Sequence, residues 1–167
     1  KDNKLSKVDK IDLDYIDNNN SKNKYILERI KNNNYELKGS LLNADPIITS
    51  LLESKDTQQL NIFRENINIS LNFFEVNLDS NNVIKNLKGK LQIKDNKLDQ
   101  ANLSAQFDNN KDIIFSINTK DDEKITTLYS SKARPFVNKY KFIEGFEDSD
   151  EGFLDFYSSK KGGISNS

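Results

Sequence analysis

The stretch from Asn86 to Phe107 reads NLKGKLQIKDNKLDQANLSAQF. Its apolar side chains occupy alternate positions on both sides of the DNK triplet at 95–97, and most residues between them are Lys, Gln, Asn or Ser. The alternating apolar residues are Leu87, Leu91, Ile93, Ala101, Leu103, Ala105 and Phe107. Because successive side chains of a strand point to opposite faces, the stretch predicts a two-faced β-hairpin.

The same alternation recurs through most of the chain. Further strands are predicted over residues 11–15, 25–30, 35–39, 67–78, 113–117, 125–129 and 153–159. Asn32–Asn34 predicts a tight turn, since Asn tolerates left-handed backbone angles. The alternation changes phase at Phe73–Phe74, which predicts a β-bulge. Most connections are short, so the pattern favours an antiparallel meander.

Two segments have helical spacing instead. Asp45 and Pro46 suit the start of a helix, and an apolar stripe follows at Ile47, Ile48, Leu51 and Leu52. Near the C-terminus, Ala133, Phe136, Val137 and Tyr140 share one helix face. The sequence therefore predicts two short amphipathic helices beside a mainly β fold.

Composition excludes several functions. The 167 residues suffice for one domain with a core, and the net charge of -1 gives no general attraction to nucleic acid. The absence of His and Cys rules out Ser-His-Asp and Cys-His catalysis and the usual structural zinc sites within this chain. We expect no cofactor, no metal and no enzymatic activity.

One acidic cluster resembles a metal loop only superficially. It comprises Glu144, Glu147, Asp148, Asp150 and Glu151. An EF-hand would require a Glu six residues after Gly152, but that position is Ser158. A pair of glycosidase carboxylates is equally unsupported. A solvated acidic loop is the favoured interpretation.

The apolar strand faces leave two interpretations open. They can form an ordinary core covered by the two helices, which the pattern alone favours. Alternatively, two short helices are too few to cover so many strands, and the uncovered face binds lipid or a partner.

A resemblance to AsmA-like proteins of Gram-negative bacteria favours the second interpretation. It is carried by VIKNLKGKLQIKDNKLDQANLSAQFDNNKDIIFSI at 83–117 and KITTLYSSKARPFVNKYKFIEGFEDSDEGFLDFYS at 124–158. Asn86–Gly89 and Ala101–Ala105 fit the family's first pattern, and Ser131–Tyr140 and Glu151–Leu154 fit its second. Glu151 replaces the usual Gly. The similarity extends over about 9–158, and its motifs are structural.

The resemblance implies a periplasmic protein anchored in the inner membrane by a helix outside this chain. In that family a long sheet curls into a groove with an apolar lining. The proteins are implicated in moving phospholipids toward the outer membrane, and they have no catalytic residues. We therefore expect residues 1–167 to be one segment of a larger β-groove domain, with irregular ends at 1–23 and 159–167. A start without Met, a signal peptide or a long apolar run agrees with such a segment.

The expected fold is mainly β: a curled antiparallel sheet with two short amphipathic helices. Its expected partner is phospholipid, with unidentified envelope proteins as further partners. The expected lipid-binding residues are Leu87, Leu91, Ile93, Leu103, Phe107, Ile113, Phe115 and Ile117. The alternative is a β-rich interaction or scaffold module of an envelope protein that binds no lipid.

Overall fold

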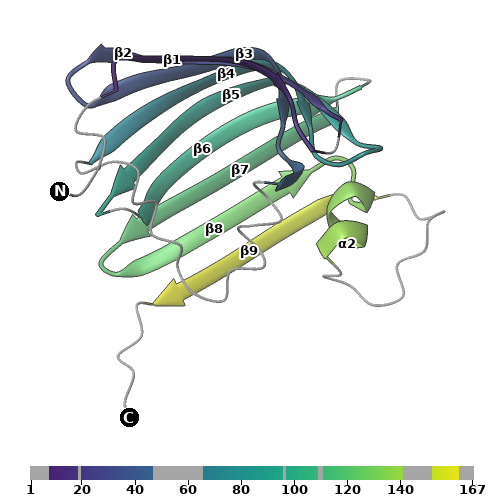
Figure 1. The fold of residues 1–167 in the computed structure, drawn as a ribbon. Coiled ribbons are helices and arrows are strands. Elements are labelled where there is room, and N and C mark those ends of the chain that lie inside the picture. The colour runs from purple at the N-terminus through teal and green to yellow at the C-terminus, as the bar shows by residue number, and fades with distance from the viewer. Residues whose placement is uncertain are drawn as a thin grey trace.

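Nine strands form one sheet in the computed structural model of the chain, which describes residues 8–18, 20–46, 66–95, 97–108, 111–140 and 152–161 (Figure 1). The strands are β1 (Lys10–Ile16), β2 (Lys22–Lys31), β3 (Asn34–Asn43), β4 (Ile67–Asn77), β5 (Val83–Lys94), β6 (Lys97–Phe107), β7 (Lys111–Lys120), β8 (Glu123–Ser130) and β9 (Leu154–Lys161). A short helix, α2 (Arg134–Tyr140), lies between β8 and β9 in the chain.

Strand order in the sheet follows strand order in the sequence. Seven of the neighbouring pairs are antiparallel, but β3 and β4 run parallel, with Leu37 opposite Leu71. The prediction of a wholly antiparallel sheet is therefore wrong at this pair. A parallel pair needs a crossover of roughly a dozen residues or more, and residues 44–66 provide that length. The sheet is mixed and largely antiparallel.

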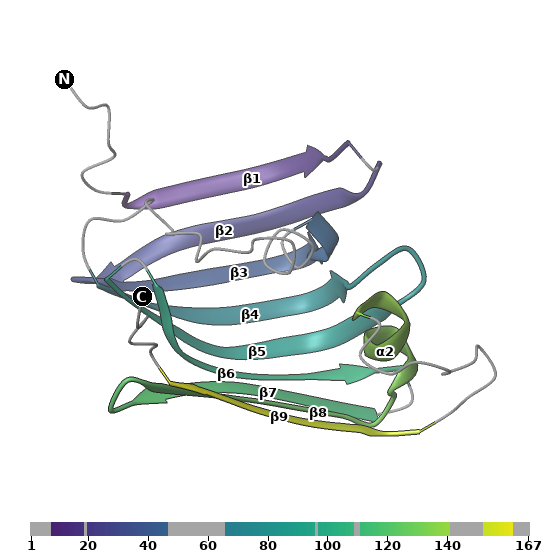
Figure 2. The ribbon, with the colours of Figure 1, turned by 90° about the horizontal axis from the view of Figure 1, so that it is seen from below.

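The prediction of a curled groove is also corrected. The sheet is open and not strongly curled, and Figure 2 shows the strands side by side with α2 on one side near one end. Bulges and other irregularities are what bend a sheet. Among the described strand pairs, register shifts occur only in the β2–β3 pair and the β5–β6 pair, which is few for a sheet that would roll into a groove.

The helix prediction is confirmed for one of the two segments. α2 coincides with the predicted stripe from Ala133 to Tyr140. Of the other predicted helix, only Asp45 and Pro46 are described, and both are helical; its apolar stripe lies outside the described residues. Among the described residues, α2 is therefore the one helix that can be compared over its full length with a prediction.

The predicted turns and the phase change at Phe73–Phe74 are confirmed, but the predicted β-bulge there is wrong. Neither of the two described pairings of β4 has a register shift. Asn32 and Asp95 have positive φ angles of 50° and 51° in the turns after β2 and β5. Phe73 is buried and Phe74 is 63% exposed. Before this point the buried side chains have odd numbers, as in Ile69 and Phe73, and after it they have even numbers, as in Val76 and Leu78. Asn86 on β5 has a φ of 54°. Both strands therefore change phase at the same level, so their mutual register is preserved.

The ends are more regular than predicted. Residues 10–16 form β1, whose Ile11 and Leu13 pair with Leu27 and Tyr25 of β2; this confirms the strand predicted over 11–15 and corrects the expectation of an irregular end over all of 1–23. At the other end, β9 continues to Lys161, two residues beyond the strand predicted over 153–159, into the part that was expected to be irregular. Pairing with a neighbouring strand satisfies backbone groups that an isolated polar segment would leave to water.

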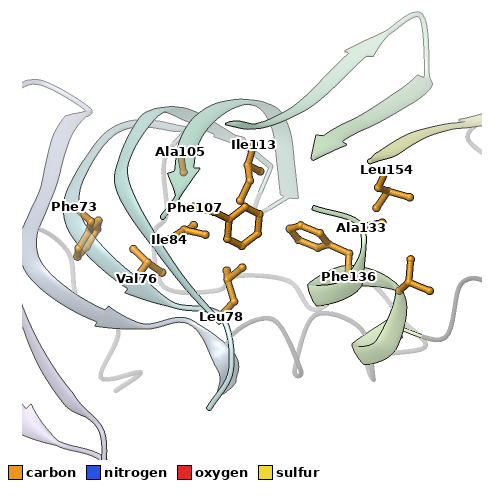
Figure 3. Close-up of a cluster of buried hydrophobic side chains, with 11 residues drawn as sticks. Phe73, Val76, Leu78, Ile84, Ala105, Phe107, Ile113, Ala133, Phe136 and Leu154 are labelled. Carbon is orange, nitrogen blue, oxygen red and sulfur yellow. The ribbon is translucent and has the colours of Figure 1, made fainter. Parts of the chain in front are cut away.

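The main core lies between α2 and one face of the sheet. Figure 3 shows the Phe107 and Phe136 rings facing one another, and their centroids are 6.4 Å apart at 68°. The buried members of this cluster are Phe73, Val76, Leu78, Ile84, Ala105, Phe107, Ile113, Ala133, Phe136, Val137 and Leu154. The Ala133 N–H donates to the Gly152 carbonyl over 2.8 Å, which ties the start of α2 to the approach to β9.

Candidate functional site: an apolar sheet face

One row of residues, eight with apolar side chains and one glycine, crosses all nine strands on the same face as α2. Each strand pairing places one member opposite the next. The row consists of Ile11, Leu27, Leu37, Leu71, Gly89, Leu103, Phe115, Leu128 and Phe156. Every member is partly buried, and none is polar. The register thus joins nine separate alternations into one continuous apolar strip.

A second row beside it strengthens this strip in the middle of the sheet. It runs through Tyr35, Ile69, Leu91, Ala101 and Ile117. Four of these side chains are buried, and Leu91 is partly buried. The apolar face is therefore at least two residues wide from β3 to β7.

All eight residues expected to bind lipid lie on this face. Ile93, Phe107, Ile113 and Ile117 are buried, whereas Leu87, Leu91, Leu103 and Phe115 are partly buried. Phe107 and Ile113 belong to the core beneath α2, as Figure 3 shows. The structure therefore separates residues that pack under the helix from residues with accessible surface.

Leu103 and Phe115 form the accessible centre of the face. They are direct cross-strand neighbours on β6 and β7, and neither belongs to the two buried clusters among the described residues. The sequence-based set omitted the parts of the face on β1–β4 and β8–β9. The sequence shows the alternation at Ile11, Leu27 and Leu37, but no local sequence pattern indicates that these strands share a sheet with β5–β7.

The opposite face carries charged pairs together with exposed apolar side chains such as Phe74 and Ile114. The Lys24 Nζ atom lies 3.3 Å from Oδ2 of Asp14, and the Lys38 Nζ atom lies 2.6 Å from Oε2 of Glu36. Lys85 and Asp108 are 2.7 Å apart; their hydrogen bond raises the pKa of Lys85 and lowers the pKa of Asp108. These charged groups favour contact of this face with water, which distinguishes it from the face that carries the apolar row.

The apolar face becomes polar at one corner. The Lys124 ammonium donates to the Leu98 carbonyl over 3.3 Å. Burial lowers the pKa of Lys124, Asp99 opposes this effect, and the nearby positive charge of Lys160 adds to it. A long side chain that keeps its apolar stem on the sheet and its charge at the border is typical of such an edge.

Two tyrosines lie at the β1–β2 end of the face. The Tyr15 and Tyr25 ring centroids are 6.4 Å apart at 75°, and Tyr25 also meets Phe73 at 6.2 Å. Burial, then the hydrogen bond to Tyr15, raises the pKa of Tyr25 to about 12. Both effects favour the neutral phenol in the folded state.

The stability contributed by Tyr25 is expected to depend on pH at the alkaline end. The folded state holds this proton more tightly than the unfolded chain, whose tyrosine titrates near 10.0, so the contribution is complete below pH 10 and is lost as pH rises toward about 12. Urea unfolding between pH 9 and 12, followed by circular dichroism, measures the slope. Tyr25→Phe should make the decline shallower, and Tyr157→Phe, at an exposed position, should not. Equal slopes in both variants would contradict the assignment.

The described residues contain no cluster of three or more side chains suited to a metal ion. Within the same residues, no helix has both the length and the apolar character needed to span a membrane. Comparison with family models, curated proteins and solved structures finds no match. The fold and the site define this chain as an open nine-stranded mixed sheet, with a row of apolar residues across one face and both charged pairs and exposed apolar side chains on the other.

Proposed function

We propose that this chain binds acyl chains along its apolar sheet face, as a periplasmic segment that carries phospholipid between the inner and outer membranes. The observation that carries the proposal is the partly buried apolar row that crosses all nine strands. Each methylene removed from water contributes roughly 0.8 kcal/mol, so continuity matters more than a tight fit. In this proposal the acyl chain lies on an open sheet face and not in a strongly curled groove.

The length of the row suits a sliding ligand. Eight spacings of about 4.8 Å between neighbouring strands give roughly 38 Å. One leaflet of a bilayer contributes about 15 Å of hydrocarbon, half of the usual thickness. An acyl chain would therefore have several equivalent positions along the row, and no catalytic group is needed.

The envelope location rests on the resemblance to AsmA-like proteins. That resemblance supports a periplasmic site and a membrane anchor outside this chain, with phospholipid as partner. The division of the sheet into an apolar face and a charge-paired face is consistent with this role, because the lipid headgroup can remain in water at the border.

Phe115→Gln is expected to weaken phospholipid binding. Loss of one apolar contact worth roughly 1.5–3 kcal/mol should reduce affinity by about tenfold or more. The binding of a fluorescent short-chain phosphatidylethanolamine measures this change. Ile114→Gln is the matched control, since Ile114 is the next residue on the same strand, points to the opposite face and is 50% exposed.

Photocrosslinking separates a binding defect from a folding defect. Benzoylphenylalanine at position 115 should label radiolabelled phospholipid in vesicles, and the same group at position 114 should not. Equal labelling from both positions, or none from position 115 in a folded protein, would overturn the proposal.

A second candidate, a protein interaction module, is favoured by a different observation. The face opposite the apolar row carries exposed apolar side chains near β9, where the centroids of the Tyr129 and Phe153 rings lie 6.5 Å apart. Exposed clusters of this kind are common at protein contacts. Tyr157→Ser with Tyr129→Ser would disrupt such a contact and leave phospholipid binding intact.

A further inference from the structure

A pocket of about 390 Å³ lies at one corner of the sheet. The turn between β1 and β2 and the end of β3 meet at this corner, and Figure 2 shows them at the same end of the sheet. Its lining includes the Tyr15 and Tyr25 rings, Asp17 and Asn43, and the apolar surfaces of Leu42 and Pro46. No part of the acyl-chain proposal uses this pocket.

Two aromatic rings form adjoining walls of the pocket. Tyr15 and Tyr25 meet at 75°, so their ring planes are nearly perpendicular. The face of an aromatic ring carries negative electrostatic potential and attracts cations, and aromatic cages of this kind recognise quaternary ammonium groups. The walls therefore favour a positively charged, compact and apolar ligand group.

The polar side of the pocket is rigid. The Asp17 carboxylate accepts hydrogen bonds from the Ser21 N–H at 2.9 Å, the Asn43 amide at 2.6 Å and the Asn23 amide at 3.3 Å. Asn23 and Asn43 are 1% and 7% exposed, and the Asn43 N–H donates to the Asn23 side-chain oxygen over 2.8 Å. Buried polar groups joined in this way hold the carboxylate in one position.

The charge of the pocket lining favours a positively charged ligand. Its described lining has the Asp17 carboxylate and no Lys or Arg. Lys22 lies opposite Ile16 in the strand register but does not line the pocket, and Lys24 is engaged with Asp14. The Asp17 oxygens already accept several amide hydrogens, so a ligand that brings charge without N–H donors is the best match. A quaternary ammonium group has these properties.

We propose that this corner pocket binds a quaternary ammonium group, packed against the Tyr15 and Tyr25 rings that line it and facing the Asp17 carboxylate. The apolar surfaces of Leu42 and Pro46 contact its methyl groups. The group can belong to a lipid headgroup or to a free choline-like amine, because the recognised chemistry is the same. This proposal is independent of acyl-chain binding on the sheet face.

Titration of the ¹⁵N-labelled protein with choline, followed by amide chemical shifts, tests the pocket. Choline should shift the signals of the β1–β2 turn and the end of β3. 3,3-Dimethyl-1-butanol, its neutral isostere, should bind about fivefold more weakly or worse, as expected for loss of cation–π and charge contacts. Equal affinities for the two compounds, or no shifts at this corner, would overturn the proposal.

Variants locate the interaction. Tyr15→Leu removes one wall at a 42% exposed position and should weaken choline binding by about fivefold. Tyr157→Leu, an exposed tyrosine on β9, should leave it unchanged. Asp17→Asn should weaken binding while the amide spectrum stays dispersed; if this variant unfolds, Tyr15→Leu decides. Unchanged choline affinity in folded Tyr15→Leu would contradict the proposal.

A comparison with glycerophosphocholine identifies the source of the group. Tighter binding than choline supports a lipid headgroup, and weaker binding supports a free amine. Both outcomes retain the pocket as a quaternary ammonium site, whereas no binding of either compound removes it.

Discussion

Phe73→Ala is expected to lower the free energy of unfolding by about 3–5 kcal/mol, the range for deleting a buried aromatic ring. Phe73 is 1% exposed and belongs to the main core. Its ring meets Tyr25 at 6.2 Å and lies so close to Gly39 that a Cβ there would come within 2.9 Å of it. The surrounding strands are hydrogen-bonded on both sides of β4 and cannot easily close the cavity. Urea unfolding followed by circular dichroism measures the change.

The next residue provides a matched control for this prediction. Phe74 has the same side chain but is 63% exposed on the opposite face. Phe74→Ala should change the free energy of unfolding by no more than about 0.5 kcal/mol, as for most surface substitutions. A larger loss from Phe74→Ala than from Phe73→Ala would mean that the phase change in β4 has been assigned in the wrong direction.

Gly89→Ala is expected to destabilise the fold by about 3 kcal/mol, at the upper end of the range for overpacking. A Cβ at position 89 would collide with the Asn102 carbonyl oxygen and come within 2.8 Å of the Leu103 Cα. Both contacts are with the backbone of β6, so relief requires the two strands to separate. Gly89 also has a φ of 157°, which L side chains rarely adopt.

The consequence of Gly89→Ala should extend to the apolar row. Gly89 lies opposite Leu103 on β6, and its missing side chain lets the Leu103 methyl approach within 2.7 Å of the Cβ position. Thermal unfolding compared with Gly152→Ala tests the explanation, because a Cβ at Gly152 would meet nothing within 4 Å. Similar losses in both variants would show that glycine flexibility, and not strand contact, sets the cost.

Local patterns in the sequence predicted the strands and their two faces. Alternation at Leu87, Leu91 and Leu103 indicates which side avoids water, because the side-chain period of a strand is two. Turn residues such as Asn32 and Asp95 were equally readable, since their left-handed angles are a local property. The α2 stripe was predicted for the same reason.

Local sequence patterns did not predict which distant strands pair with one another. The parallel contact between β3 and β4 joins residues on either side of 44–66, and no local preference encodes which strand becomes the neighbour. For the same reason, the sequence-based site stopped at β5–β7, and the expected curl had no support in the register of most strand pairs.

The sequence by itself determined that alternate residues along each strand share a water-avoiding face, because that depends only on backbone geometry. Only the tertiary structure decided that nine such faces align into one row, that α2 covers Phe107 and Ile113 but not Phe115, and that Tyr15 and Asn43 meet at one corner. These features depend on register between strands distant in sequence, which is set by the packing of the whole sheet.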